Sequence, residues 1–175
     1  LKELQLGASV PVINSLCDLY HPCQALADFM SLQELFGTVS GRTLAYVGDG
    51  NNVSHSLMLT GSKLGVNLII VTPEGHSVDD KIATQAYQLA SETGSHLTIT
   101  SDLTAIDQVD AIYADTWVSM GDNTALNAIL ATFKPYQITT DLMKRLNAQY
   151  FMHCQPAHRG QEVTGEVLDS PQSII

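Results

Sequence analysis

The polar residues best suited to chemistry fall into three short stretches of the sequence. Residues 48–52 read Gly-Asp-Gly-Asn-Asn, residues 115–121 read Asp-Thr-Trp-Val-Ser-Met-Gly, and residues 153–160 read His-Cys-Gln-Pro-Ala-His-Arg-Gly. Each stretch follows or ends a short apolar run, and polar groups buried beside such a run are costly unless they have partners. The density of these groups makes the three stretches the candidate functional loops.

The first two stretches could bind the charged groups of an amino acid. Asp115 follows an apolar run and suits a substrate ammonium group through charge-assisted hydrogen bonds. Asn51 and Asn52 would begin a helix whose free N–H groups, together with a side-chain amide, suit a small carboxylate. Two structural alternatives stay open: Asp115 as a helix cap or an Asx turn, and residues 48–52 as a tight strand-to-helix turn.

The first stretch resembles a dinucleotide-binding fingerprint only in part. Gly48 and Gly50 match its first two glycines, but Val53 occupies the position of the third. The next apolar run ends at Val71 and Thr72, without the acidic residue that would bind a ribose hydroxyl. A dinucleotide-binding domain is therefore the weakest of the function hypotheses.

The third stretch contains a cysteine among cationic residues. His153, His158 and Arg159 lie close to Cys154 in the sequence, and nearby cations would lower the pKa of its thiol and favour the thiolate. The alternative is that Cys154 is a small buried hydrophobe. The spacing of His153, Cys154 and His158 matches no common zinc pattern, so we predict no metal site.

Three further histidines stand alone in the sequence. His55, His76 and His96 have no neighbouring constellation of ligand or catalytic residue types. We interpret them as surface histidines or as buried histidines whose hydrogen bonds are satisfied.

Five apolar runs alternate with helical segments and must position these loops. The runs are continuously apolar, which is typical of a parallel sheet covered on both faces. We therefore predict a doubly wound, Rossmann-like α/β fold with a mainly parallel five-stranded sheet, in which ligands bind beyond the carboxyl ends of the strands. The predicted strands are 43–47, 67–71, 96–100, 111–114 and 150–153, and the predicted helices are 22–36, 51–64, 78–92, 102–108, 125–131 and 140–146.

The helix predicted over 22–36 begins with Pro22, which suits a first turn, and ends before Gly37. Its apolar residues recur at helical spacing and predict one amphipathic helix. These residues are Leu26, Phe29, Met30, Leu32 and Leu35.

Composition narrows the class of protein. The chain has 175 residues, of which 45% are hydrophobic and 15% charged, so it can form a packed core. A formal net charge of −10 argues against binding to nucleic acid, which requires clustered cations. The sequence has no long apolar run and no secretory signal, and its three cysteines are an odd number. We predict no membrane association and a cytoplasmic location.

Four motifs in order resemble one family, the aspartate/ornithine carbamoyltransferases, and most closely its ornithine-using members. His21-Pro22-Cys23-Gln24 is similar to the family's HPxQ segment, and residues 48–52 to its GDGNN turn. Residues 115–121 resemble the DxWxSMG loop, and residues 153–156 resemble HCLP. The four motifs extend over nearly the whole chain.

The resemblance implies transfer of a carbamoyl group from carbamoyl phosphate to the δ-amine of ornithine, giving citrulline and phosphate. It implies no metal or organic cofactor, and a homotrimer. His21 and Gln24 would contact the carbamoyl group, whose carbonyl His21 would polarise. Cys154 would position and deprotonate the amine, and Gln155 would place a backbone carbonyl near the carbamoyl amide. The ornithine-binding residues would be Asn52, Asp115, Ser119 and Met120.

The sequence departs from the family pattern in two ways. Gln155 replaces the leucine of HCLP, which leaves putrescine or N-acetylornithine open as the amine substrate. The phosphate-binding Ser-x-Arg-Thr-Arg segment is absent, as is an arginine expected just beyond Ile175. We therefore expect residues 1–40 to be an N-terminal segment with an interdomain helix and residues 41–175 to be the amino-acid-binding domain. Without the N-terminal domain, this chain would be inactive or only bind an amino acid.

Overall fold

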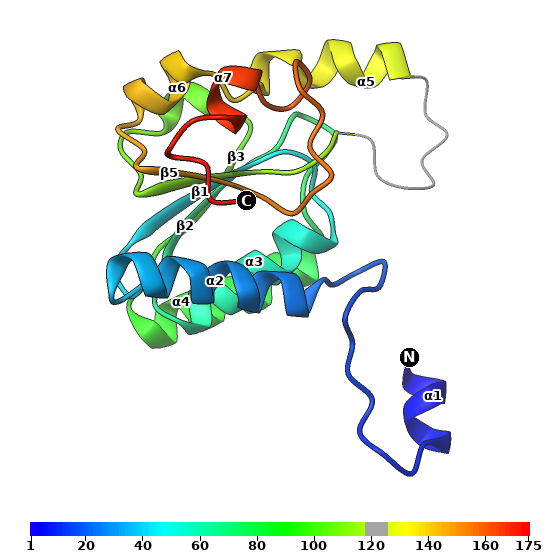
Figure 1. Cartoon of the computed structure of the whole chain (residues 1–175). Coiled ribbons are helices and arrows are strands. Elements are labelled where there is room, and N and C mark those ends of the chain that lie inside the picture. Colours follow the sequence, from blue (N-terminus) through cyan, green and yellow to red (C-terminus); the bar gives the residue numbers. More distant parts are fainter. Residues whose placement is uncertain (118–125) are drawn as a thin grey trace.

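The computed structural model describes residues 1–117 and 126–175, and its centre is a five-stranded parallel sheet (Figure 1). The strand order is β3-β2-β1-β4-β5, with every neighbouring pair parallel. The prediction of a doubly wound parallel sheet is confirmed. The strands are β1 (Thr43–Val47), β2 (Asn67–Val71), β3 (Leu97–Thr100), β4 (Ala111–Ala114) and β5 (Tyr150–His153).

Helices cover both faces of the sheet. Three long helices lie on one face, and three shorter ones lie on the other (Figure 1). The first group is α2 (Pro22–Phe36), α3 (Asn52–Lys63) and α4 (Asp80–Thr93), and the second is α5 (Leu126–Phe133), α6 (Thr140–Arg145) and α7 (Gly165–Leu168). Single 3₁₀ turns lie at Leu103–Ala105 and Lys134–Tyr136, and α1 (Lys2–Gly7) precedes the body of the fold.

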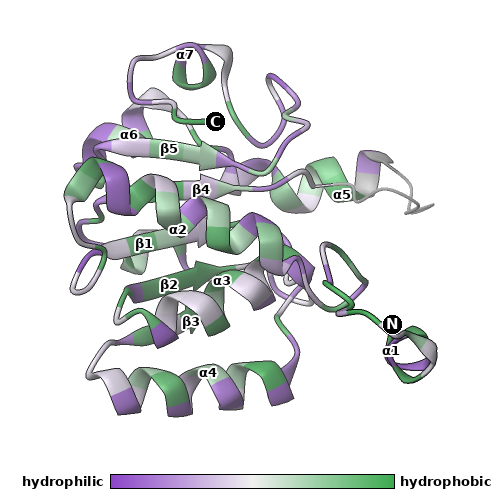
Figure 2. Cartoon of the chain, turned by 60° about the horizontal axis from the view of Figure 1, so that its bottom comes forward, coloured by the Kyte–Doolittle hydropathy of each residue, from purple (hydrophilic) through white to green (hydrophobic). Residues whose placement is uncertain are grey.

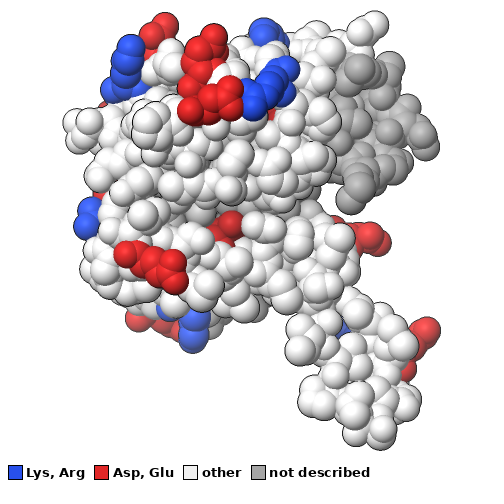
Figure 3. All heavy atoms as spheres, viewed as in Figure 1, with Lys and Arg blue, Asp and Glu red and all other residues white. Residues whose placement is uncertain are grey.

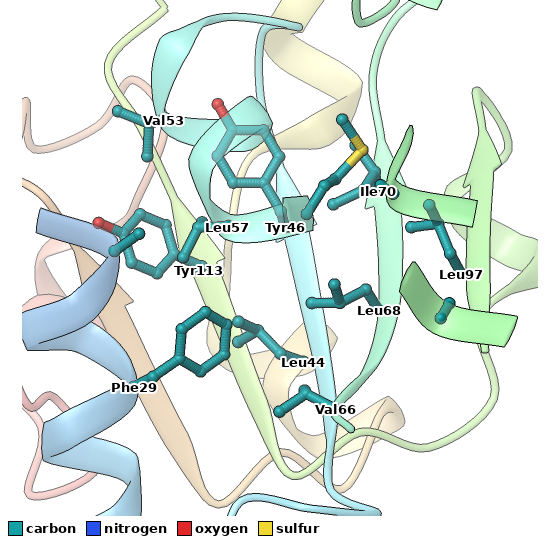
Figure 4. Packing of buried hydrophobic residues seen from close by; sticks show 14 of the residues in the cluster. Phe29, Leu44, Tyr46, Val53, Leu57, Val66, Leu68, Ile70, Leu97 and Tyr113 are labelled. Carbon is teal, nitrogen blue, oxygen red and sulfur yellow. The ribbon is translucent and has the colours of Figure 1, made fainter. Parts of the chain in front are cut away.

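The strands form because their residues are apolar on both faces, which only a doubly covered sheet can bury. Hydrophobic residues accordingly concentrate in the strands and on the inner sides of the helices (Figure 2). On one face, Phe29 of α2 packs beside Leu44 of β1, and the Tyr46 and Tyr113 rings stack with centroids 6.1 Å apart (Figure 4). Two large clusters of buried residues, one on each face, therefore hold the strand ends in fixed positions. A third, smaller cluster contains Trp117, Ile129 and Phe133.

The bounds of α2 are confirmed, but its buried face is not the one predicted. Phe29 and Leu32 are buried, whereas Leu26, Met30 and Leu35 are 59%, 61% and 44% exposed. The helix is apolar around most of its circumference, so spacing alone could not identify the side that packs against α3. The buried side also includes Ala25 and Asp28.

Three other element predictions needed adjustment. Residues 102–108 are predicted as a helix, but the structure has only a 3₁₀ turn at Leu103–Ala105, which the Asp102 side chain caps. Helix α4 begins at Asp80, because Asp79 caps it by accepting hydrogen bonds from the backbone N–H groups of Lys81 and Ile82. Residues 125–131 were predicted as a helix, and the described part of that segment is helical from Leu126 to Phe133. The short helices α1 and α7 were not predicted.

The N-terminal segment extends away from the body as an arm carrying α1 (Figure 1). Its apolar side chains are open to solvent, with Leu6 88% and Ile13 78% exposed. Charged side chains of both signs gather over α6 and α7, while the visible face around α2 and the arm carries only a few charged patches, mostly acidic (Figure 3). Among the described residues, none of the helices has the length and apolar character needed to cross a bilayer.

Candidate active site

The candidate loops meet because of the order of the strands. The chain turns in opposite directions from β1, toward β2 on one side and β4 on the other, and such a switch point opens a crevice beyond the carboxyl ends. β1, β4 and β5 are neighbours, so the loops that follow them lie at one edge of the sheet. These are the three polar stretches of the sequence.

Asp115, directly after β4, is the centre of the hydrogen-bond network at this edge. Its side chain is only 4% exposed. Oδ2 accepts a hydrogen bond from Nδ2 of Asn51 at 2.6 Å, and Oδ1 accepts from the Thr116 N–H at 2.7 Å. Oδ1 also accepts from the Cys154 thiol at 2.9 Å. Three chain segments thus converge on one buried carboxylate.

Cys154 is a hydrogen-bond donor at this site, which corrects the predicted thiolate. Burial, followed by the charge of Asp115 and the hydrogen bond to it, raises the pKa of the Cys154 thiol far above its ordinary value. The thiol is therefore neutral at physiological pH. The prediction failed because it relied on residues near Cys154 in the sequence and not on the carboxylate that faces it.

The histidine and arginine side chains near Cys154 in the sequence are directed elsewhere. The buried His153 ring lies with Nε2 3.2 Å from Oε1 of Glu162, and the Thr116 hydroxyl lies 3.2 Å from Nδ1 of His158. Arg159 forms two hydrogen bonds to Asp169, at 2.6 and 2.8 Å. In the described part of the chain, no group of three or more His, Cys, Asp or Glu side chains is arranged to hold a metal ion.

Asn51 is a site residue to which the family resemblance gave no role, since it assigned substrate binding to Asn52. Its Oδ1 accepts hydrogen bonds from the Val53 and Ser54 N–H groups, which caps α3, while its Nδ2 holds Asp115. The capping pattern Asn-x-x-Ser was the available sequence signal. Asn52 instead donates from Nδ2 to the Cys17 carbonyl at 2.9 Å.

His21 immediately precedes α2 and is fixed at two atoms. Its backbone N–H donates to the Ser56 hydroxyl of α3 at 2.7 Å, and its Nδ1 lies 2.9 Å from the Ser15 carbonyl oxygen. His55 of α3 holds the same segment, since its Nδ1 lies 3.1 Å from the Leu19 carbonyl and its Nε2 accepts from the Asp79 N–H. His55 is thus a satisfied buried histidine, and burial lowers its pKa.

Several predicted site residues line one cleft of about 550 Å³, which lies at this edge of the sheet. Gln24 does not line it, and donates from Nε2 to Asp28 one turn into α2. Ser119 and Met120 lie outside the described residues. The predicted residues in the cleft are His21, Asn52, Asp115, Cys154 and Gln155.

Gln155 adopts an unusual backbone conformation at the rim of the cleft. Its φ is +59°, in the left-handed region, and the peptide bond to Pro156 is cis. Its backbone N–H donates to Nδ1 of His153, and its side-chain Oε1 accepts from the Ala157 N–H. The exposed side chain is therefore occupied within its own loop.

Comparison with protein families adds an independent line of evidence. Residues 40–175 match the aspartate/ornithine carbamoyltransferase Asp/Orn binding domain. Residues 1–34 match the carbamoyl-P binding domain of the same family.

The similar proteins and structures described below are all named ornithine carbamoyltransferases. An ornithine carbamoyltransferase from Vibrio sp. is 53% identical over 175 residues, which are the whole chain and 58% of that relative. The structure of the Pyrococcus furiosus ornithine carbamoyltransferase matches 99% of this chain and 56% of its own, with 46% identity and a TM-score of 0.93. A Campylobacter jejuni anabolic ornithine carbamoyltransferase gives a TM-score of 0.89 at 30% identity, over 96% of this chain and 56% of its own. The chain belongs to the aspartate/ornithine carbamoyltransferase family.

Proposed function

We propose that this chain forms the amino-acid-binding part of an enzyme that transfers the carbamoyl group of carbamoyl phosphate to the δ-amine of ornithine. The observation that carries the proposal is the buried Asp115 carboxylate, which faces a cleft shared with His21 and Cys154. A buried anion at a strand end suits the α-ammonium group of an amino acid. The ornithine carbamoyltransferase relatives support the choice of substrate.

In the reaction, the neutral δ-amine attacks the carbamoyl carbon and a C–N bond forms. Phosphate leaves with the electrons of the broken C–O bond and takes up the proton that the δ-nitrogen loses. The His21 ring would polarise the carbamoyl carbonyl, and Asn52 and the Met120 backbone N–H would hold the ornithine carboxylate. A neutral thiol is a poor base, so the raised pKa favours Cys154 as a group that orients the amine over one that deprotonates it. Gln24 and Gln155 would contact the carbamoyl amide.

The complete enzyme would have a second domain that holds the phosphate. The chain spans 58% of the Vibrio sp. relative. The match of residues 1–34 to the carbamoyl-P binding domain supports an N-terminal partner domain that would cover the apolar arm, with residues 41–175 as the ornithine domain. We propose that the complete enzyme is a cytoplasmic homotrimer. The isolated 175-residue chain would bind ornithine but would not catalyse the transfer.

The test is citrulline formation by a full-length protein containing this chain, with ornithine, putrescine and N-acetylornithine as competing substrates. We expect the highest kcat/KM with ornithine, because Asp115 needs a free α-ammonium group as its partner. Asp115→Asn should lower kcat/KM for ornithine about 10- to 100-fold, since a charge-assisted bond becomes a neutral one. Preference for putrescine or N-acetylornithine, or an unchanged value in Asp115→Asn, would contradict the assignment.

A further inference from the structure

The buried face of α2 carries one carboxylate that the reaction above does not use. Asp28 is 7% exposed, although the other buried residues of this helix are apolar. A charge buried among apolar groups is costly unless specific contacts compensate for it. Asp28 lies two helical turns after His21, so it is on the side of α2 that leads to the cleft.

Asp28 makes its hydrogen bond to Gln24. Nε2 of Gln24 donates to Oδ1 of Asp28 at 2.9 Å, across one turn of the helix. A carboxylate can only accept hydrogen bonds, so this contact selects the nitrogen end of the Gln24 amide. No hydrogen bond to the Gln24 Oε1 occurs within the described residues, and this acceptor is left for another group.

The surroundings of Asp28 connect it to the candidate site. The Tyr113 hydroxyl of β4 neighbours both the Asp28 carboxyl and the Cys154 thiol, and it points toward α2 (Figure 4). Burial raises the pKa of Asp28 to about 6, opposed by Gln24, Tyr113 and His21. Asp28 is thus still predominantly an anion at neutral pH and remains an acceptor for Gln24.

We propose that Asp28 is a positioning residue, which holds Nε2 of Gln24 so that Oε1 of Gln24 accepts a hydrogen bond from the N–H₂ group of the carbamoyl donor. This inference rests on the proposed function. With Asp28 absent, the Gln24 amide can rotate and present its nitrogen to the donor, where two N–H₂ groups would oppose each other.

The test is a double-mutant cycle in a full-length protein containing this chain, with citrulline formation as the readout. Asp28→Leu removes the acceptor while it keeps the branched shape of the side chain, and it should lower kcat/KM for carbamoyl phosphate about 10- to 100-fold. In a Gln24→Ala background the same change should have no further effect, because Asp28 acts through Gln24. Ornithine affinity should stay within about twofold, since Asp28 does not line the cleft.

A second variant covers the case in which Asp28→Leu does not fold. Asp28→Asn keeps the shape and one acceptor oxygen, so its loss should be smaller than that of Asp28→Leu and should also vanish with Gln24→Ala. Gln88 and Glu92, on the exposed side of α4, form the same contact at 3.2 Å, and Glu92→Leu is the matched control that should leave activity unchanged.

Two results separate the inference from the proposed function. If the unmodified protein forms no citrulline from ornithine, the proposed function fails. If that protein is active but the losses of Asp28→Leu or Asp28→Asn persist in the Gln24→Ala background, Asp28 acts only on the structure and the inference fails. A folded Asp28→Leu variant with the kcat/KM of the unmodified protein would also overturn it.

Discussion

At the scale of single residues, the site depends on the hydrogen bonds that the Asp115 carboxylate accepts. Asp115 accepts hydrogen bonds from Asn51, Thr116 and Cys154, which lie in three separate segments. Its negative charge disfavours ionisation of the thiol that it binds, so the two groups cannot both be anions without cost. A substrate ammonium group would compensate the buried negative charge of Asp115.

The coupling between Asp115 and Cys154 can be measured by alkylation. In a chain with Cys17 and Cys23 replaced by serine, Asp115→Asn should lower the pKa of Cys154, because a neighbouring negative charge and its acceptor are removed. The iodoacetamide reaction at pH 8 should accelerate about tenfold. Asp49→Asn, at the same edge of the sheet, is the control and should leave the rate unchanged. Equal rates in both variants would show that burial alone suppresses the thiolate.

At the scale of elements, the caps of the helices have separable roles. Asn51 caps α3 and Asp79 caps α4, and each side chain accepts two backbone hydrogen bonds. Only Asn51 also donates to Asp115. Its capping role therefore fixes the same side chain that orients the site carboxylate, which ties the start of the helix to the geometry of the cleft.

Replacing each cap by alanine should separate stability from binding. Asn51→Ala and Asp79→Ala should each lower the free energy of unfolding by about 1–2 kcal/mol, measured by urea denaturation of this chain. Only Asn51→Ala should also weaken ornithine binding in calorimetry, because Asp115 loses its amide donor. Comparable binding losses in the two variants would mean that helix stability, and not the contact to Asp115, controls affinity.

The positions of helices and strands were predicted well where residues close together in the sequence determine them. All five strands lie where continuous apolar runs placed them, and Gly37 ends α2 with a φ of +75°, which suits glycine. The buried side of α2 could not be predicted in this way. Gly61 of α3 has no side chain at the point where Phe29 and Leu68 approach, and this close contact selects the side that α2 buries.

At the scale of the whole molecule, a buried charge at Asp28 should reduce stability. The folded state raises its pKa from the ordinary 3.8 to about 6, so the folded protein binds the proton more tightly than the unfolded chain. The contribution of Asp28 to stability is therefore greatest below pH 4 and is lost as the pH rises to 6. The groups around it are Gln24, Tyr113, His21 and Cys154.

This cost should be visible in the pH dependence of unfolding. At pH 7.5, Asp28→Asn should raise the free energy of unfolding by about 2–3 kcal/mol, because the variant buries no charge. At pH 4.5 the difference should shrink, since Asp28 is then mostly protonated in the folded protein. Urea denaturation of this chain at both pH values measures it. A gain that is equal at the two pH values would mean that Asp28 does not titrate as stated.

The sequence by itself determined the strands, their parallel arrangement and the four motifs, because these depend on residues that are close together in the chain. It placed Asp115 and Cys154 at one edge, since parallel strands share the edge where their carboxyl ends lie. His21, which precedes a helix, is held beside them by its hydrogen bond to Ser56 of α3. Only the tertiary structure decided which polar groups of the site become hydrogen-bond partners. Cys154 meets the carboxylate of Asp115, 39 positions away, instead of its cationic neighbours, and its thiol stays protonated because charge acts through space and burial strengthens it.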